Sequence, residues 1–139
     1  MAELNFDTGA VTYTINGKCE VCFNPTDSAF VKRVFETFER MDARQEAVDK
    51  KVAAADTKEL FDLCDEMNRE MRADIDRVLG KPVADELFGD INVFALANGL
   101  PIWCNLMLAL IDTTDDAFSA ERKKTNPRLA KYTAKYTKK

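Results

Sequence analysis

The sequence predicts a mainly α-helical protein with an N-terminal β-hairpin, an α+β fold in which the hairpin packs on a helical bundle. Two observations predict this class. Apolar and polar residues alternate within residues 11–23, and apolar residues recur at helical spacing over most of the remainder. A chain of 139 residues has the size of one domain. We therefore expect a single hairpin-plus-helix domain over 1–125 and a basic C-terminal tail over 126–139.

The hairpin is predicted by two runs of period-two patterning on either side of Asn16-Gly17. A two-residue loop would place apolar residues opposite charged ones. A three-residue loop instead places Tyr13 on the same face as Val21 and Phe23. We therefore expect a three-residue loop with Gly17 in the left-handed conformation. Because an isolated hairpin is marginally stable in water, its apolar face needs a cover.

Two long helices are expected to follow the hairpin. The first begins after residues 24–27, which supply caps, and it carries an apolar stripe from Phe30 to Met41 that we expect to cover the hairpin. Beyond Met41 the helix becomes polar, which is typical of a projecting helical arm or of a connector. A second helix is predicted between a capping box at Asp56 and a glycine stop at Gly80. Together they predict an antiparallel helical hairpin.

Shorter elements and one apolar helix are expected in the C-terminal half. Helical turns are predicted at 82–88 and 90–98, each followed by glycine. A helix from Ile102 to about Lys124 follows. Its core positions are expected to be Trp103, Leu106, Met107, Leu110 and Ile111.

The composition lowers the expectation of an enzyme. The chain contains no His, which removes the commonest general acid–base group and the commonest metal ligand. The acidic residues are typical of solvated helix faces and show no converging pair. The glycines are scattered, so no phosphate-binding loop is indicated. We therefore expect no catalytic residue and no cofactor.

The Cys-x-x-Cys spacing of Cys19 and Cys22 is interpreted as incidental to the hairpin. Zinc takes four ligands, and the remaining thiols, Cys64 and Cys104, are isolated on apolar helical faces. Residues three apart on a strand also point to opposite sides. We therefore expect no metal site and no redox site at this pair.

The net charge of −4 conceals an uneven distribution. Eight of the 20 Lys and Arg, and none of the 24 Asp and Glu, lie in residues 122–139, which leaves 12 basic and 24 acidic residues in 1–121. The basic tail could bind nucleic acid or dock on an acidic protein surface. The acidic remainder repels phosphate and favours protein docking.

Membrane insertion and secretion are not indicated by the sequence. The longest apolar run, Leu106–Ile111, is far shorter than a membrane span. The N-terminal residues lack the pattern of a signal peptide, and the cysteines suit a reducing cytoplasm.

The hairpin VTYTINGKCEVCFN, followed at once by an amphipathic helix, resembles the small tail assembly chaperones of long-tailed bacteriophages and prophages. The segment DIDRVLGKPVADELFGDINVF and the Lys-Tyr-Thr repeats of the tail also resemble small proteins encoded among prophage tail genes. The resemblance implies a non-enzymatic protein of the host bacterial cytoplasm. It implies that the chain binds the tape measure protein and tail tube subunits.

The partner-binding candidates are exposed apolar residues on the helical body and aromatic or basic residues of the tail. They are Phe61, Met67, Met71, Phe88, Phe94, Lys131, Tyr132, Lys135 and Tyr136. The helical spacing of the first five residues is also compatible with positions in the hydrophobic core. The alternatives are a structural virion component, such as a head–tail connector or tail completion protein, and a nucleic-acid-binding protein acting through the tail. Homo-oligomerisation is compatible with each of them.

Overall fold

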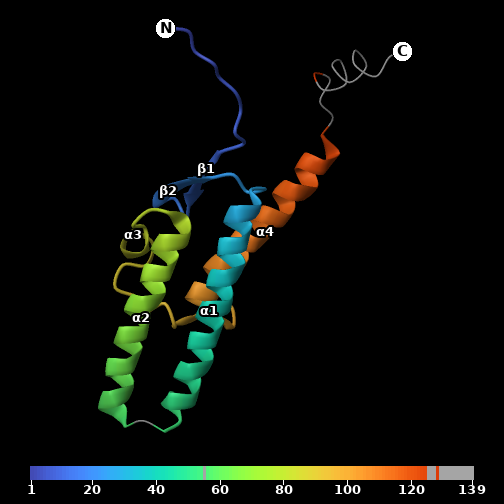
Figure 1. Cartoon of the computed structure of the whole chain (residues 1–139). Coiled ribbons are helices and arrows are strands. Elements are labelled where there is room, and N and C mark those ends of the chain that lie inside the picture. The colour runs from blue at the N-terminus through green and yellow to red at the C-terminus, as the bar shows by residue number, and fades with distance from the viewer. Residues whose placement is uncertain (55, 125–127, 129–139) are drawn as a thin grey trace.

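A computed structural model of the chain describes residues 1–54, 56–124 and 128. In these residues two long helices lie side by side, a third long helix packs against one of them, and a hairpin covers one end (Figure 1). The predicted α+β fold, an N-terminal hairpin on helices, is confirmed. The elements are β1 (Val11–Ile15), β2 (Cys19–Phe23), α1 (Ser28–Val52), α2 (Thr57–Leu79), α3 (Ala84–Phe88), β3 (Leu96–Ala97), β4 (Leu100–Pro101) and α4 (Ile102–Lys123).

The β1–β2 hairpin has the predicted register. Ile15 pairs with Cys19 across a three-residue loop, and Tyr13 pairs with Val21, so the apolar residues share one face. Gly17 has a φ of 67°, as expected, and Asn16 has a φ of 51°, which the sequence reading did not foresee. Asn enters the left-handed region at lower cost than most residues, so Asn16 and Gly17 can both have a positive φ in this loop.

The cover of the hairpin differs from the prediction. Phe30, at the start of α1, stacks on Phe23 with ring centroids 4.2 Å apart, but the rest of the α1 stripe packs against α2 and α4. A five-residue strand spans about 17 Å, whereas a 25-residue helix spans about 38 Å. The hairpin is therefore too short to cover the whole α1 stripe, and its Phe23 meets the stripe at Phe30, near the start of α1.

The helical hairpin is confirmed, and its caps are the predicted ones. The Asp27 carboxylate accepts from the Ala29 N–H, and the Asp56 carboxylate accepts from the Glu59 N–H. Gly80 ends α2 in the left-handed conformation, with a φ of 71°. The polar half of α1 is thus the projecting arm rather than a connector, since it continues as one helix to Val52.

The expected helical turn at 90–98 is wrong. β3 and β4 form a small hairpin there, with Asn98-Gly99 as a two-residue loop in which both φ angles are positive. The Val93 N–H donates to the Asn68 side-chain oxygen and the Phe94 N–H donates to that of Asn92. These side-chain acceptors replace the carbonyls that a helix would supply.

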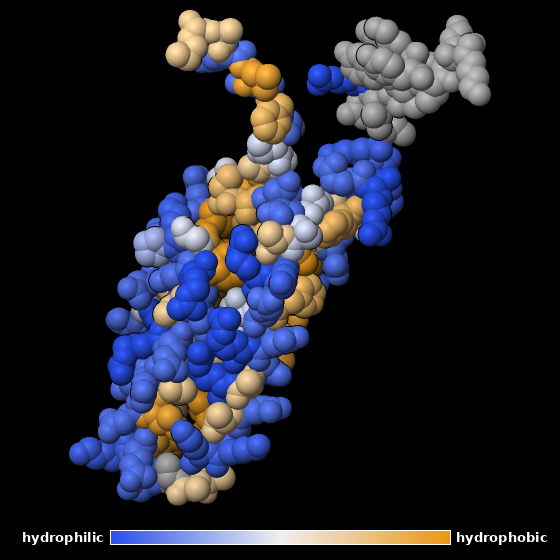
Figure 2. Space-filling model, in the orientation of Figure 1, coloured by the Kyte–Doolittle hydropathy of each residue, from blue (hydrophilic) through white to orange (hydrophobic). Residues whose placement is uncertain are grey.

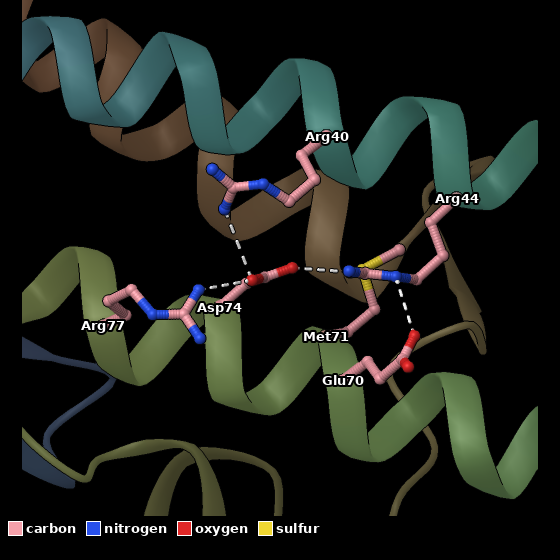
Figure 3. Close-up of polar contacts among 6 residues, drawn as sticks. All are labelled: Arg40, Arg44, Glu70, Met71, Asp74 and Arg77. Atoms are coloured by element: carbon pink, nitrogen blue, oxygen red, sulfur yellow. Dashed lines mark hydrogen bonds and ion pairs between the residues drawn. The ribbon is translucent and has the colours of Figure 1, made fainter.

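A buried carboxylate lies between the two long helices. Asp74 of α2 is only 4% exposed, and it accepts hydrogen bonds from Arg40 and Arg44 of α1 and from Arg77 of its own helix (Figure 3). The Arg44 Nε also lies 3.2 Å from a carboxylate oxygen of Glu70. The cluster fixes α1 against α2 in one register, because a buried carboxylate needs these partners.

The surface is mostly hydrophilic on the face drawn in Figure 2. None of the helices in the described residues combines the length and the apolar composition of a membrane span. Apart from Arg128, the expected tail at 126–139 lies outside the described residues.

Replacing Asp74 with Ala is expected to lower the free energy of unfolding by about 3 kcal/mol, because the largely buried Arg44 would lose its main counter-charge. Chemical denaturation measures the change. Asp62→Ala, which removes an exposed carboxylate of the same helix, is the control and should change the value by less than about 0.5 kcal/mol. A loss below about 1 kcal/mol for Asp74→Ala would contradict the assigned role.

Candidate partner-binding groove

α4 carries apolar residues on two faces, and only one of them is fully buried. Trp103, Met107 and Leu110 lie in the core at spacings of four and three residues. Ile102, Leu106 and Ala109 follow the same spacing one position earlier and remain partly or largely exposed. Periodicity explains this pattern, since residues three and four apart share a helix face. The Ile102–Ala109 side is therefore an apolar surface without a complete cover among the described residues.

This exposed side of α4 forms the floor of an apolar groove. One part of the groove, of about 350 Å³, lies between α4, the tip of the β1–β2 hairpin and the segment after α3. A second part, of about 210 Å³, continues between α4 and β1. Four residues line both parts: Ile15, Asn16, Leu106 and Ala109. The other lining residues are Tyr13, Thr14, Val21, Phe23, Leu87, Phe88, Ile91, Ala97, Ile102, Asn105, Leu110 and Thr113.

Arg72 of α2 holds the wall of the groove that faces α4. Its guanidinium donates to the carbonyl oxygens of Gly89 and Ile91, each at 2.7 Å, and to the Asp85 carboxylate at 2.9 Å. The side chain is 13% exposed and lies 5.8 Å from the centre of the Phe88 ring. The planar fork of Arg suits this set of acceptors. The wall is thus fixed before any partner binds.

A lysine at the tip of the β1–β2 hairpin ties the hairpin to α3. The Lys18 ammonium donates to the Leu87 carbonyl at 3.3 Å, which ties the β1–β2 loop to α3. At the other hairpin strand, Lys81 donates to the Glu20 carbonyl at 3.0 Å. These two contacts set the distance between the hairpin and the segment after α2.

The lining offers apolar contact rather than reactive groups. No carboxylate, lysine or arginine lines either part. The titratable member of the lining is Tyr13, and burial raises the pKa of its phenol above the ordinary value, so the ring stays neutral near pH 7. A surface of this composition can bind an apolar segment of another protein.

The structure separates the five predicted partner residues on the helical body. Phe88 lines the groove. Phe61 is 64% exposed near the start of α2, outside the groove lining, and Met67 is partly buried on that helix. Met71 is 0% exposed, which corrects its assignment as a surface residue, because its side chain lies in the core beside Arg44. Phe94 is partly buried and packs against the core.

The other predictions concern the tail and α4. Lys131, Tyr132, Lys135 and Tyr136 lie outside the described residues. Leu106 was expected in the core; it is partly buried and packs against the core, and it also lines the groove. Ile91, which lies in the predicted candidate segment Phe88–Phe94, also lines the groove. Ile102 and Ala109 were not predicted, and the second apolar stripe on α4 was the available signal for them.

The two hairpin thiols point to opposite faces, as predicted. Cys19 is buried and Cys22 is exposed. Burial raises the pKa of the Cys19 thiol above its ordinary value, and Glu86 adds to the rise while Lys81 opposes it. In the part of the chain that the structure describes, no three Cys, Asp or Glu side chains are grouped so that they could hold a metal ion.

Comparison with protein-family models, curated proteins and solved structures found no match to this chain. Function is therefore inferred from the residues and the geometry described above.

Replacing Arg72 with Lys is expected to loosen the groove wall, because an ammonium cannot reach three acceptors with the geometry of a guanidinium. Amide hydrogen exchange should become at least about tenfold faster in residues 89–93, equivalent to about 1.4 kcal/mol of local stability. Arg69→Lys, at an exposed position of the same helix, is the control. Unchanged exchange in 89–93 would show that Arg72 does not hold the wall.

The thiols are expected to react in a fixed order. A raised pKa leaves less Cys19 thiolate at any given pH, so iodoacetamide should alkylate Cys22 first and require a higher pH for Cys19. Peptide mass spectrometry of time points assigns each site. Cys22→Ser should remove the early modification, and equal rates at the two cysteines would refute the assigned burial.

Proposed function

We propose that this protein is a non-enzymatic assembly adaptor that binds an amphipathic helix of a partner protein along the exposed face of α4. The observation that supports this most is the second apolar face of α4, with Ile102, Leu106 and Ala109 along the floor of a groove. These residues span about 10 Å, close to two helical turns. A partner helix with apolar residues at i, i+3, i+4 and i+7 matches such a floor.

The rigid walls favour a binding surface over a reactive centre. Arg72 and Lys18 hold the two sides in place, and the described lining contains no acid, lysine or arginine. A pre-formed groove lowers the entropic cost of association, because fewer groups are ordered on binding.

The proposed partner is the tape measure protein of a long-tailed bacteriophage, with tail tube subunits recruited in turn. Support comes from the resemblance of the hairpin and first helix to tail assembly chaperones, whose partner is long, helical and rich in apolar residues. The groove on α4 suits such a helix. Covering the apolar stripe of the tape measure protein would keep that protein soluble until assembly.

Two alternatives stay open as proposals. A structural virion component would use the same groove and would be found in purified particles, whereas a chaperone leaves before completion. A nucleic-acid-binding function would depend on the basic tail, most of which lies outside the described residues. The groove itself favours a protein partner, since it carries no cation to meet phosphate.

Co-expression with the tape measure protein of the same phage genome tests the proposal. The two proteins should co-purify, and Ala109→Asp should weaken binding about 30-fold, equivalent to about 2 kcal/mol, because it places a charge on the apolar floor. Ser119→Asp adds the same charge to an exposed part of α4 outside the groove and is the matched control.

Absence of co-purification would contradict the proposed partner. Wild-type affinity of Ala109→Asp would contradict the proposed surface. Recovery of the protein from purified virions would replace the chaperone with the structural component.

A further inference from the structure

The first residues of the chain form an exposed, extended segment that stands clear of the body (Figures 1 and 2). Leu4 is 85% exposed and Phe6 is 76% exposed. They alternate with Glu3, Asn5 and Asp7, which is the pattern of a strand with one apolar face. An extended segment with this pattern and no cover is typical of one that pairs with another chain.

Residues 7–9, at the C-terminal end of this segment, are held against the hairpin. The Asn24 side chain donates to the Thr8 carbonyl at 2.9 Å, and the Gly9 N–H donates to the Asp7 carboxylate at 2.8 Å. Gly9 has a φ of 74°, and a Cβ there would lie 2.6 Å from the Asn24 amide nitrogen. These contacts direct residues 1–7 away from the body. The segment therefore does not turn back onto its own β1.

β1 has an open outer edge. The Lys18 N–H donates to the Ile15 carbonyl at 2.9 Å, so Ile15 belongs to a pair bonded across the hairpin. Bonded and non-bonded pairs alternate along antiparallel strands. Thr12 and Thr14 therefore direct their N–H and C=O groups away from β2, and no described backbone group outside the hairpin pairs with them.

The open edge lies beside the second part of the groove. Its lining includes Tyr13 and Ile15 from the inner face of β1 and Leu106 and Leu110 from α4. The groove of about 210 Å³ continues the apolar inner face of the hairpin past β1. A third strand at this edge would direct alternate side chains into it.

We propose that the N-terminal segment of one copy of this protein adds as a third strand to the outer edge of β1 of a second copy, with Leu4 and Phe6 entering the groove beside Tyr13 and Ile15. The partner at this edge must be extended, because a helix satisfies its own backbone groups and leaves Thr12 and Thr14 unpaired. Among the described residues, 1–7 have the extended conformation, the exposure and the alternation that the edge requires. Reciprocal exchange gives a closed dimer with twofold symmetry.

The mass of the isolated protein in sedimentation equilibrium tests the exchange without any partner. The wild-type chain should form a dimer of twice the 15.7 kDa chain mass. Leu4→Ser with Phe6→Ser should give a monomer, and because both side chains are exposed this variant stays folded. Glu3→Ser with Asn5→Ser changes the polar side of the same segment and should remain dimeric.

The edge is tested separately. Thr14→Pro removes the outward N–H and should give a monomer, whereas Thr14→Val keeps it and should remain dimeric. Mixing the Leu4→Ser/Phe6→Ser variant with Thr14→Pro should restore a dimer, because one copy still has an intact edge and the other an intact segment. Circular dichroism confirms that each variant is folded.

A monomeric wild-type protein would overturn the proposal, as would a dimer that persists in the Leu4→Ser/Phe6→Ser variant. Failure of the mixed variants to associate would show that the segment and the edge do not bind each other. The segment of the second copy enters the second part of the groove, beside β1, whereas the partner helix is proposed for the first part, between α4 and the segment after α3. Binding of the tape measure protein is measured in another experiment, so the exchange and the proposed function can fail separately.

Discussion

The short hairpin, which must bury its apolar face, is the constraint on which the rest of the structure depends. Its strands span about 17 Å, whereas the 22 residues of α4 span about 33 Å. The hairpin seals the ends of the long helices around Phe23 and Phe30 and stops there. The Ile102–Ala109 side of α4 is covered only in part, with Ile15 of the hairpin beside Leu106 and Ala109. The space that remains between the hairpin and α4 is the groove.

Two arginine-centred sites keep this arrangement rigid. Asp74 is held by three arginines between α1 and α2, which fixes the register of the helical hairpin. Arg72 lies two residues before Asp74 on α2 and holds the loop that forms the groove wall. A buried ion pair adds little net stability and is better understood as a device for specificity. In this chain the ion pair of Asp74 positions α2, and Arg72 of α2 holds the groove wall.

The sequence was most informative where the signal is local. The hairpin register followed from which residues must share a face, and the ends of α2 followed from Asp56 and Gly80. The segment at 90–98 was missed because Asn98-Gly99 was interpreted as a helix stop rather than a hairpin loop. Leu106 packs against the core as predicted, but its second role in the groove was missed, because periodicity shows which residues share a helix face and does not show which neighbour covers it.

The central claim is that the uncovered face of α4 is where a partner helix binds. Amide hydrogen exchange of the complex with a co-expressed tape measure fragment tests it most directly. The account predicts slower exchange on binding in residues 15–16, 87–97 and 102–110, with little change in the α1–α2 arm near Phe61. Protection confined to that arm, or no protection along α4, would contradict it.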